Sequence, residues 1–262
     1  MKKNYNNSVE GSGYVNKVSP IGEDKENARA FFVTVKNDLT GAVYNLIVRT
    51  SSKEEADKIR EMGKDAFENL RNKNVENYQR KPSHTMSFEG IYKPSVYDAE
   101  QKKEKFPARI EVCNKTLEPT LKGNSLVDSC TFAGNLISMN DRQINGKDAL
   151  SVTIATHFEL EDGRKMTDYI DTLVFKNEKP GAYEQLKERG IGDFIRIEGR
   201  MGSDMLINTN NVILLRKKGE KVSEAAEVKE APAKKAAAKA EKAEGEKKGA
   251  KRTSRKKNTM SL

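Results

Sequence analysis

The stretch that decides the fold is residues 129–216, SCTFAGNLISMNDRQINGKDALSVTIATHFELEDGRKMTDYIDTLVFKNEKPGAYEQLKERGIGDFIRIEGRMGSDMLINTNNVILLR. Apolar and polar residues alternate with period two, as in Val152-Thr-Ile-Ala155, which is the pattern of a half-buried strand. Asn145-Gly146 is a hairpin-turn signal, and Pro180-Gly181 begins a short helix that Gly190 ends. The stretch therefore predicts, in order, strands at 131–139, 150–158 and 166–175, the helix, and strands at 194–201 and 206–215.

Five short strands with one helix between the third and the fourth is the order of elements in an OB-fold, a five-stranded Greek-key barrel. The first 120 residues repeat this order, with strands expected at 13–18, 30–36 and 42–50, a helix at about 53–72, and strands at 85–91 and 107–112. The tripeptides Phe88-Glu-Gly90 and Ile197-Glu-Gly199 fall at the same point of the two halves. We predict a mostly β chain of two tandem OB-folds, with a first domain at 1–125 and a second at 126–216.

The predicted helix of the first domain has one apolar face and a capped start. Either Ser51 or Ser52, together with Glu54 or Glu55, is expected to form the N-terminal cap. The apolar face consists of Ala56, Ile59, Met62, Ala66 and Leu70.

The positive charge of the chain is concentrated near its C-terminal end. The chain has 48 Lys and Arg against 39 Asp and Glu, and residues 216–262 contain 16 of the basic and 7 of the acidic residues. The net charge of +9 thus lies entirely in 216–262, and 1–215 is neutral. Residues 217–262 are poor in apolar side chains, which predicts a disordered basic tail. Nucleic-acid affinity of 1–215 must come from local patches.

The sequence offers little catalytic chemistry. It has no GxxxxGK[ST], HExxH or GxSxG motif, so we expect no enzyme activity and no cofactor. Cys113, Cys130, His84 and His157 have no zinc-site spacing, so no metal is expected. The start of the chain lacks an apolar segment and no run is long enough to span a membrane, which, with two lone cysteines, favours the cytoplasm.

The strand at 166–175 carries the main candidates for binding. Ile170, Thr172 and Val174 are the better core-facing set, which leaves Tyr169 and Phe175 outward, where bases could stack. Ordinary core or interface roles are the alternative, because a one-residue slip in register exchanges the two faces.

Together, Phe132-Ala-Gly-Asn-Leu136, Val152-Thr-Ile-Ala-Thr156 and Gly192-Asp-Phe-Ile-Arg-Ile-Glu-Gly199 make the second domain resemble the bacterial single-stranded DNA-binding protein family. The resemblance covers about 85 residues; the first domain resembles the family only in the order of its elements. It implies that Tyr169 and Phe175 stack on bases, and that Phe158, near a hairpin tip, lies in the region of another stacking residue.

Basic and aromatic residues on the turns and strands around this region complete the predicted interface. In the second domain they are Arg142, Lys147, Arg164, Lys165, Lys176 and Arg200. In the first domain the faces are ambiguous, because if Arg49 points outward then Tyr44 points inward. The first-domain candidates are Phe31 or Phe32, Tyr44, Arg49, Tyr92 and Lys93, and the tail candidates are Lys251, Arg252, Arg255, Lys256 and Lys257.

Two features depart from the family pattern. The chain has no Trp, the usual stacking residue of the family, and its last residues are basic where the family has an acidic tail that recruits partners. The doubled domain and this tail suggest an accessory protein of a phage or mobile element.

The prediction from sequence is a non-catalytic protein that binds single-stranded DNA in replication or recombination. The alternatives are an OB-fold scaffold that binds proteins, which the neutral charge of 1–215 favours, and an RNA-binding protein. Replication or recombination proteins are possible partners. A homodimer is also predicted, with Val212-Ile-Leu-Leu215 and Arg196 at a two-fold interface; in the alternative, Val212 and Leu214 fill the barrel of a monomer.

Overall fold

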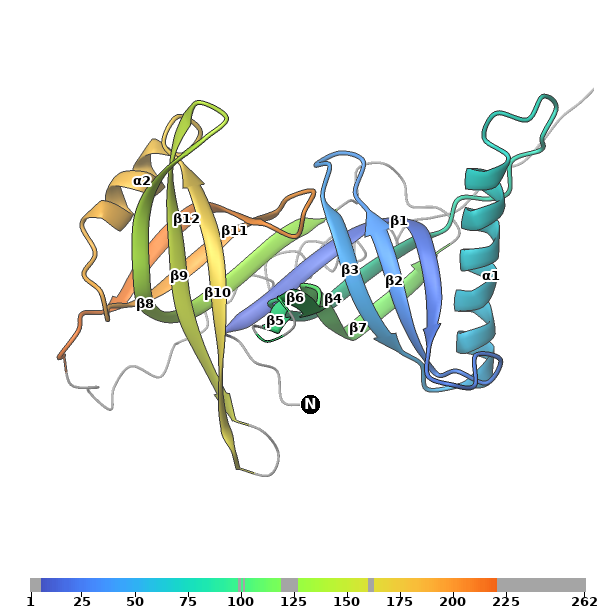
Figure 1. The fold of residues 1–262 in the computed structure, drawn as a ribbon, viewed down its shortest axis with the longest axis horizontal. Coiled ribbons are helices and arrows are strands. Elements are labelled where there is room, and N and C mark those ends of the chain that lie inside the picture. Colours follow the sequence, from blue (N-terminus) through green and yellow to red (C-terminus); the bar gives the residue numbers. More distant parts are fainter. Residues whose placement is uncertain (1–5, 99, 101, 119–126, 160–162, 221–262) are drawn as a thin grey trace, which may run out of the picture. The chain divides into compact units, whose positions relative to one another are not determined.

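The computed structural model describes residues 6–98, 100, 102–118, 127–159 and 163–220, which belong to one compact unit of the chain (Figure 1). The tail candidates from Lys251 to Lys257 therefore lie outside the described residues. Among the described residues, the helices are too short or too polar to cross a membrane.

Two five-stranded barrels follow one another along the chain. The first contains β1 (Asn7–Ile21), β2 (Ala30–Lys36), β3 (Val43–Arg49), α1 (Lys53–Arg71), β4 (Thr85–Lys93) and β7 (Arg109–Glu118). The second contains β8 (Asp128–Ile144), β9 (Lys147–Glu159), β10 (Lys165–Phe175), α2 (Pro180–Lys187), β11 (Phe194–Met201) and β12 (Ile207–Arg216). A small hairpin, β5 (Val96–Asp98) with β6 (Lys103–Phe106), lies between β4 and β7 and was not predicted.

Strand pairing confirms the tandem OB-folds. The order β1-β2-β3-β7-β4 is closed by a β1–β4 pairing, and the order β8-β9-β10-β12-β11 is closed by a β11–β8 pairing. In each barrel a helix joins the third strand to the fourth, and the third and fifth strands pair in parallel. The domain boundaries at residues 125 and 126 stay a prediction.

The shared Glu-Gly dipeptides mark the same irregularity in both barrels. The β4–β7 register shifts between Glu89 and Gly90, and the β11–β12 register shifts between Glu198 and Gly199. A Cβ on Gly90 would lie 2.6 Å from the carbonyl oxygen of Glu111, and one on Gly199 would lie 2.3 Å from a backbone oxygen of β12. Both bulges thus need a residue without a side chain, because the neighbouring backbone comes too close.

Helix α1 begins and ends close to its predicted bounds, but the end of its apolar face is exposed. Ser52 is the N-cap and its side chain accepts the backbone N–H of Glu55, while Glu55 in turn accepts the backbone N–H of Ser51. Ala56, Ile59 and Met62 of the predicted apolar face are buried, whereas Leu70 at its end is 70 % exposed. The physical reason is length: α1 has 19 residues and α2 has 8, so the last turns of α1 have less barrel to cover.

The loop that follows α2 is held by one carboxylate. Asp193 accepts the backbone N–H of Gly190 at 3.0 Å and that of Lys218 at 2.9 Å. These hydrogen bonds hold the pKa of Asp193 below its ordinary value. The carboxylate thereby connects the start of β11 to the residues just after β12.

The first strands of the two barrels pair with each other. Residues 7–11 of β1 pair with 128–132 of β8, which joins both barrels into one ten-stranded sheet. The β1–β4 register ends at the pair of Val9 and Gly90, and continuing it places Asn7 opposite Tyr92. There the buried Asn7 side chain takes the place of backbone hydrogen bonds between the strands. Its amide group donates to the backbone carbonyl oxygen of Tyr92 at 2.8 Å and accepts the backbone N–H of Tyr92 at 2.9 Å.

Candidate nucleic-acid interface

The outward surface of β8, β9 and β10 in the second barrel, called here the outer face, carries the main predicted residues. Ile170, Thr172 and Val174 are buried, as predicted from the alternation along β10. Residues with the opposite parity therefore point away from the barrel, and Tyr169 is 57 % exposed.

Both outward aromatic side chains have small neighbours across the ladder. Tyr169 pairs with Ala155 and Phe175 pairs with Ala149, so neither ring has a bulky side chain directly opposite on β9. Thr153 lies between these positions and donates to Asp171 at 2.6 Å. Tyr169 and Phe175 are six residues apart, about 20 Å along the strand at the usual rise. The outer face is thus a polar shelf with an aromatic ring toward each end.

Basic side chains are found near the Phe175 end of this shelf. Arg142 of β8 is exposed and lies in the same cross-strand row, because Ala149 pairs with both Arg142 and Phe175. The ammonium group of Lys147 is 5.9 Å from the centre of the Phe175 ring and also forms an ion pair with Glu178 at 2.9 Å. This end of the outer face combines a ring with two cations.

The other predicted cations of the second domain lie elsewhere. Arg164 and Lys165 are at the start of β10, the far end of the β9–β10 ribbon, which points downward in Figure 1. The Lys176 ammonium group is 5.6 Å from the ring centre of Tyr183 on α2. Arg200 is exposed on β11 opposite Asn208 of β12, away from the β8–β9–β10 row.

Phe158 points to the opposite face of the β9–β10 ribbon from Tyr169. It pairs with Met166, three positions along β10 from Tyr169, and three positions along a strand reverse the face. The Lys93 ammonium group of the first barrel is 4.1 Å from the centre of the Phe158 ring and 2.8 Å from an Asp168 carboxylate oxygen. Phe158 thus belongs to the junction of the barrels, and it does not form one stacking surface with Tyr169.

Two first-domain candidates were wrong as surface residues. Tyr44 is fully buried with its ring edge-on to Phe88, because it occupies the inward parity of β3. Tyr92 is 6 % exposed and its ring is edge-on to Phe132 of the second barrel, and burial raises the pKa of its hydroxyl to about 12. Neither ring can stack on a base in this arrangement.

Alternation of inward and outward side chains along β2 and β3 also shows which way the remaining first-domain candidates point. Phe31 is fully buried, so Phe32 points outward and is partly exposed. Arg49 is exposed at the end of β3. The conditional prediction that an outward Arg49 implies an inward Tyr44 is therefore confirmed.

The parallel pairs allow the two outer faces to be compared position by position. Leu46 pairs with Ile110 in the first barrel as Thr172 pairs with Ile207 in the second. By this equivalence Val43 corresponds to Tyr169 and Arg49 to Phe175. The first barrel thus lacks both β10 aromatic residues on its third strand.

The face of the first barrel is also partly covered by the β11–β12 loop, residues 202–206. The Val43 N–H donates to the Gly202 oxygen at 3.3 Å, and the Asn45 N–H lies 3.4 Å from the Met205 sulfur. Since Val43 corresponds to Tyr169, the loop lies where a stacking residue would be needed. The second barrel therefore has the more open candidate surface.

The β5–β6 hairpin is a candidate that sequence reasoning missed. Tyr97 is 63 % exposed and Phe106 is 49 % exposed, and Lys102, Lys103 and Lys105 are exposed beside them. The signal was the interleaving of aromatic and basic residues in 96–106, a pattern that suits single-strand binding. Strands of three and four residues are too short to show an alternation, which explains why the hairpin was not predicted.

The described part of the chain has no cluster of side chains that could bind a metal ion. Cys113 is exposed and Cys130 is buried, and burial raises the pKa of the Cys130 thiol. Within the ranges given above, no three His, Cys, Asp or Glu side chains lie close enough to hold a metal ion.

The chain is thus a tandem OB-fold with an aromatic, polar and basic outer face on its second barrel, and solved structures share this fold. Wild-type single-stranded DNA-binding protein from Thermus aquaticus is similar at a TM-score of 0.51 and 13 % identity, over 83 % of this chain and 96 % of that chain. A deletion mutant of the same protein gives a TM-score of 0.52 and 11 % identity, over 83 % and 98 % of the two chains. At this identity the likeness establishes the fold. No known protein family and no curated protein matches the sequence.

Proposed function

We propose that this protein binds single-stranded DNA on the outer face of its second barrel, without catalysis, and acts in DNA replication or recombination. The observation that carries the proposal is the exposed ring of Tyr169 opposite Ala155, with Phe175 further along the same strand. Base–aromatic stacking supplies sequence-tolerant affinity for single strands, and a duplex does not offer its base faces in this way.

The fold likeness supports the same reading. The Thermus aquaticus protein, which is named for single-stranded DNA binding, shares both barrels with this chain at a coverage of 83 %. Arg142 and Lys147 add cations beside Phe175, where a phosphate backbone would follow the stacked bases. The first barrel contributes Phe32, Arg49 and the β5–β6 hairpin in this proposal.

The basic stretch 217–262 is proposed to add sequence-blind interactions with phosphates. Together with Arg216, this stretch carries the whole net charge of +9 of the chain. Deleting 217–262 should make the dependence of log K on log salt shallower, by about 0.7 for each phosphate of a single strand that the stretch neutralises. An unchanged slope would assign the stretch to protein partners.

Binding curves over a series of salt concentrations test the proposal, with oligo-dT, oligo-U and duplex DNA as ligands for the full chain. The expected result is tighter binding of oligo-dT than of duplex, and weaker binding of oligo-dT by Tyr169→Ala and Phe175→Ala. Preference for oligo-U would favour the RNA-binding alternative. Binding to none of the three would favour the protein scaffold, which the neutral charge of 1–215 suits.

A homodimer and interactions with replication or recombination proteins remain proposals. Of the predicted two-fold interface, Val212 is 3 % exposed and Leu214 packs against the core, whereas Leu215 is 45 % exposed. Only part of that strand is therefore available for a second copy. Light scattering at micromolar concentrations decides between the states, since a mass of one chain throughout excludes the dimer.

A further inference from the structure

The C-terminal half of α1 forms a groove with β1. One wall is a stripe of α1, in which each residue has another three or four positions away on the same face: Arg60, Gly63, Lys64, Phe67 and Leu70. The other wall comes from residues 16–20 of β1, and the groove has a volume of about 550 Å³. A Cβ on Gly63 would lie 2.6 Å from that of Val18, so the two walls meet at this glycine.

Large apolar side chains in the groove are exposed, because no other described part of the chain covers them. Phe67 is 62 % exposed and Leu70 is 70 % exposed, although both are large apolar residues on a helix that packs on a barrel. Val18 and Pro20 line the wall opposite them. Exposed apolar groups gathered in one groove are typical of a binding surface.

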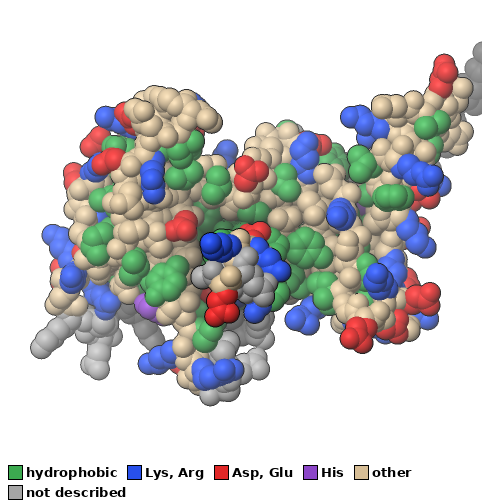
Figure 2. All heavy atoms as spheres, in the orientation of Figure 1, with side chains coloured by type: hydrophobic (Ala, Val, Ile, Leu, Met, Phe, Trp, Pro, Cys, Tyr) green, Lys and Arg blue, Asp and Glu red, His purple; other side chains and the backbone are tan. Residues whose placement is uncertain are grey.

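The charges that line the groove are all positive. Lys17, Lys25, Lys64 and Arg60 line it, and no Asp or Glu does. An adjoining groove of about 890 Å³, which shares Lys17 and Leu70, adds three further cations and a single acid. Figure 2 shows hydrophobic and basic side chains side by side along α1, at the right of the view.

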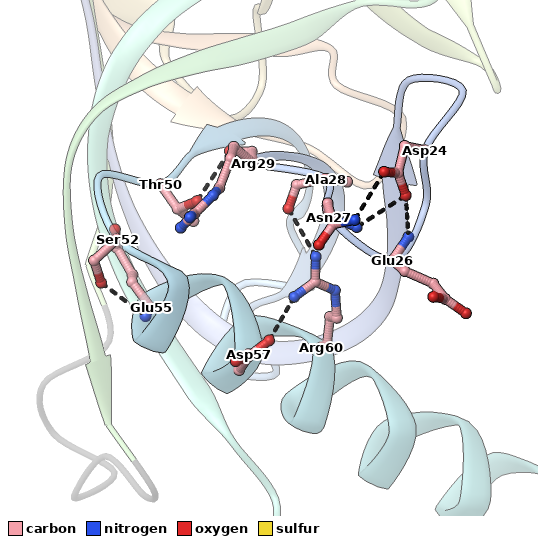
Figure 3. A network of polar contacts seen from close by, with 10 residues as sticks. All are labelled: Asp24, Glu26, Asn27, Ala28, Arg29, Thr50, Ser52, Glu55, Asp57 and Arg60. Carbon is pink, nitrogen blue, oxygen red and sulfur yellow. Dashed lines mark hydrogen bonds and ion pairs between the residues drawn. The ribbon is translucent and has the colours of Figure 1, made fainter.

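Arg60 is bonded to other groups of the protein, whereas the three lysines form no ion pair with the described residues. Its guanidinium group donates to Asp57 at 2.6 Å and to the Ala28 oxygen at 2.8 Å, which ties α1 to the loop before β2 (Figure 3). Lys17, Lys25 and Lys64 make no ion pair with the described residues of the chain. Three ammonium groups around an apolar floor are thus available to a ligand.

Charge and shape together select the occupant. The apolar floor is mostly aliphatic, whereas single-strand binding sites combine basic groups with several flat rings on which bases stack, and Phe67 is the one strongly exposed ring among the residues that line the groove. The basic stretch 217–262 has the wrong sign of charge for this rim. A segment with acidic residues on one side and apolar residues on the other matches both the rim and the floor.

We propose that this groove is a docking site for an acidic amphipathic segment of a partner protein. Apolar side chains of the segment pack between Phe67, Leu70 and Val18, and its carboxylates face Lys17, Lys25 and Lys64. The site is separate from the outer face of the second barrel, so the chain can hold a partner and a nucleic acid at the same time.

The test uses the full chain and a fluorescein-labelled amphipathic peptide built from Glu, Leu, Phe and Ala. Fluorescence anisotropy should show saturable binding that weakens with salt, and weak binding of a control peptide in which Gln replaces Glu. Phe67→Ala, Leu70→Ala and Lys64→Glu should each weaken binding by at least about fivefold, the loss typical of a residue central to an interface. Thermal unfolding of each variant should match that of the original chain, because all three side chains are exposed.

Two matched variants control for charge and for apolar surface. Lys53→Glu changes the same charge at the start of α1, outside the groove, and Ile191→Ala removes an apolar side chain that is 50 % exposed in the second barrel. Both should bind the peptide as the original chain does. Equal losses in these controls, or no loss in the groove variants, would overturn the proposal.

Location and ligand class are tested separately. A photoreactive group at the apolar end of the peptide should cross-link to residues 16–20 or 60–70, and cross-links confined to 217–262 would mean attraction to the basic stretch alone. Oligo-dT affinity should be the same in Phe67→Ala as in the original chain. A parallel loss of oligo-dT binding would instead make the groove part of a nucleic-acid path and would refute the docking site.

Discussion

Replacing Tyr169 with alanine should weaken single-strand binding and leave the fold intact. The side chain is 57 % exposed and faces Ala155, so its truncation changes the free energy of unfolding by less than about 1 kcal/mol, as for other surface positions. Loss of one stacked base costs about 1–3 kcal/mol, which corresponds to about a 5- to 150-fold rise in Kd. Anisotropy titrations with labelled oligo-dT measure the affinity, and thermal unfolding followed by circular dichroism measures the stability.

Tyr92→Ala is the matched control, because it removes the same side chain from a buried position. Tyr92 is 6 % exposed and packs edge-on to Phe132 with ring centres 5.8 Å apart. Its truncation should cost about 3–5 kcal/mol of folding free energy, the range for a large buried aromatic residue. The reasoning fails if Tyr169→Ala lowers the unfolding temperature like Tyr92→Ala while oligo-dT affinity is unchanged, since Tyr169 would then be a structural residue.

Three further tests concern the framework around the interface. Asn7→Ala should lower the free energy of unfolding in urea by about 2–4 kcal/mol, because the buried N–H and C=O of Tyr92 lose their partners; an unchanged midpoint would contradict this. Because the pKa of Asp193 is lowered in the folded chain, its ionised carboxylate stabilises the fold. This contribution to the free energy of unfolding is complete above the ordinary carboxyl pKa of about 4 and is lost as pH falls through the lower pKa of the folded chain. The difference in unfolding temperature between the original chain and Asp193→Asn should therefore shrink at low pH, and a constant difference would refute it. A double-mutant cycle of Lys93→Ala and Asp168→Ala should give a coupling of about 1–2 kcal/mol, and a coupling of zero would mean that the bridge between the barrels is not formed in solution.

Local patterns were sufficient to predict the barrels. Strands at 30–36 and 194–201 have the predicted bounds, because each is a short alternating run between turns. The Asn145-Gly146 signal also holds, with both residues at positive φ in the tight turn between β8 and β9. The alternation along β10 correctly assigned Ile170 and Val174 to the core.

The errors arise where one element depends on a distant one. β1 and β8 begin at residues 7 and 128, before the predicted starts at 13 and 131, and these added N-terminal residues include those that pair the two strands with each other. Tyr92 is buried only because the second barrel brings Phe132 against it. Phe158 was placed correctly near a hairpin tip, yet its ring faces Lys93 of the other barrel. No periodicity within either half of the sequence encodes these interactions.

The neutral charge of 1–215 and the positive charge of 216–262 suggest two separate sources of affinity for single strands, stacking and charge. On the outer face, Lys147 is paired with Glu178, and Asp171 lies between the two aromatic positions. Few counterions would be released by a strand bound there, so stacking on Tyr169 and Phe175 must supply most of the affinity of this surface. Counterion release, which sets the salt dependence, would come instead from the +9 of residues 216–262. The two sources therefore respond to different changes: aromatic substitution lowers affinity at every salt concentration, and removal of the basic stretch lowers it most at low salt.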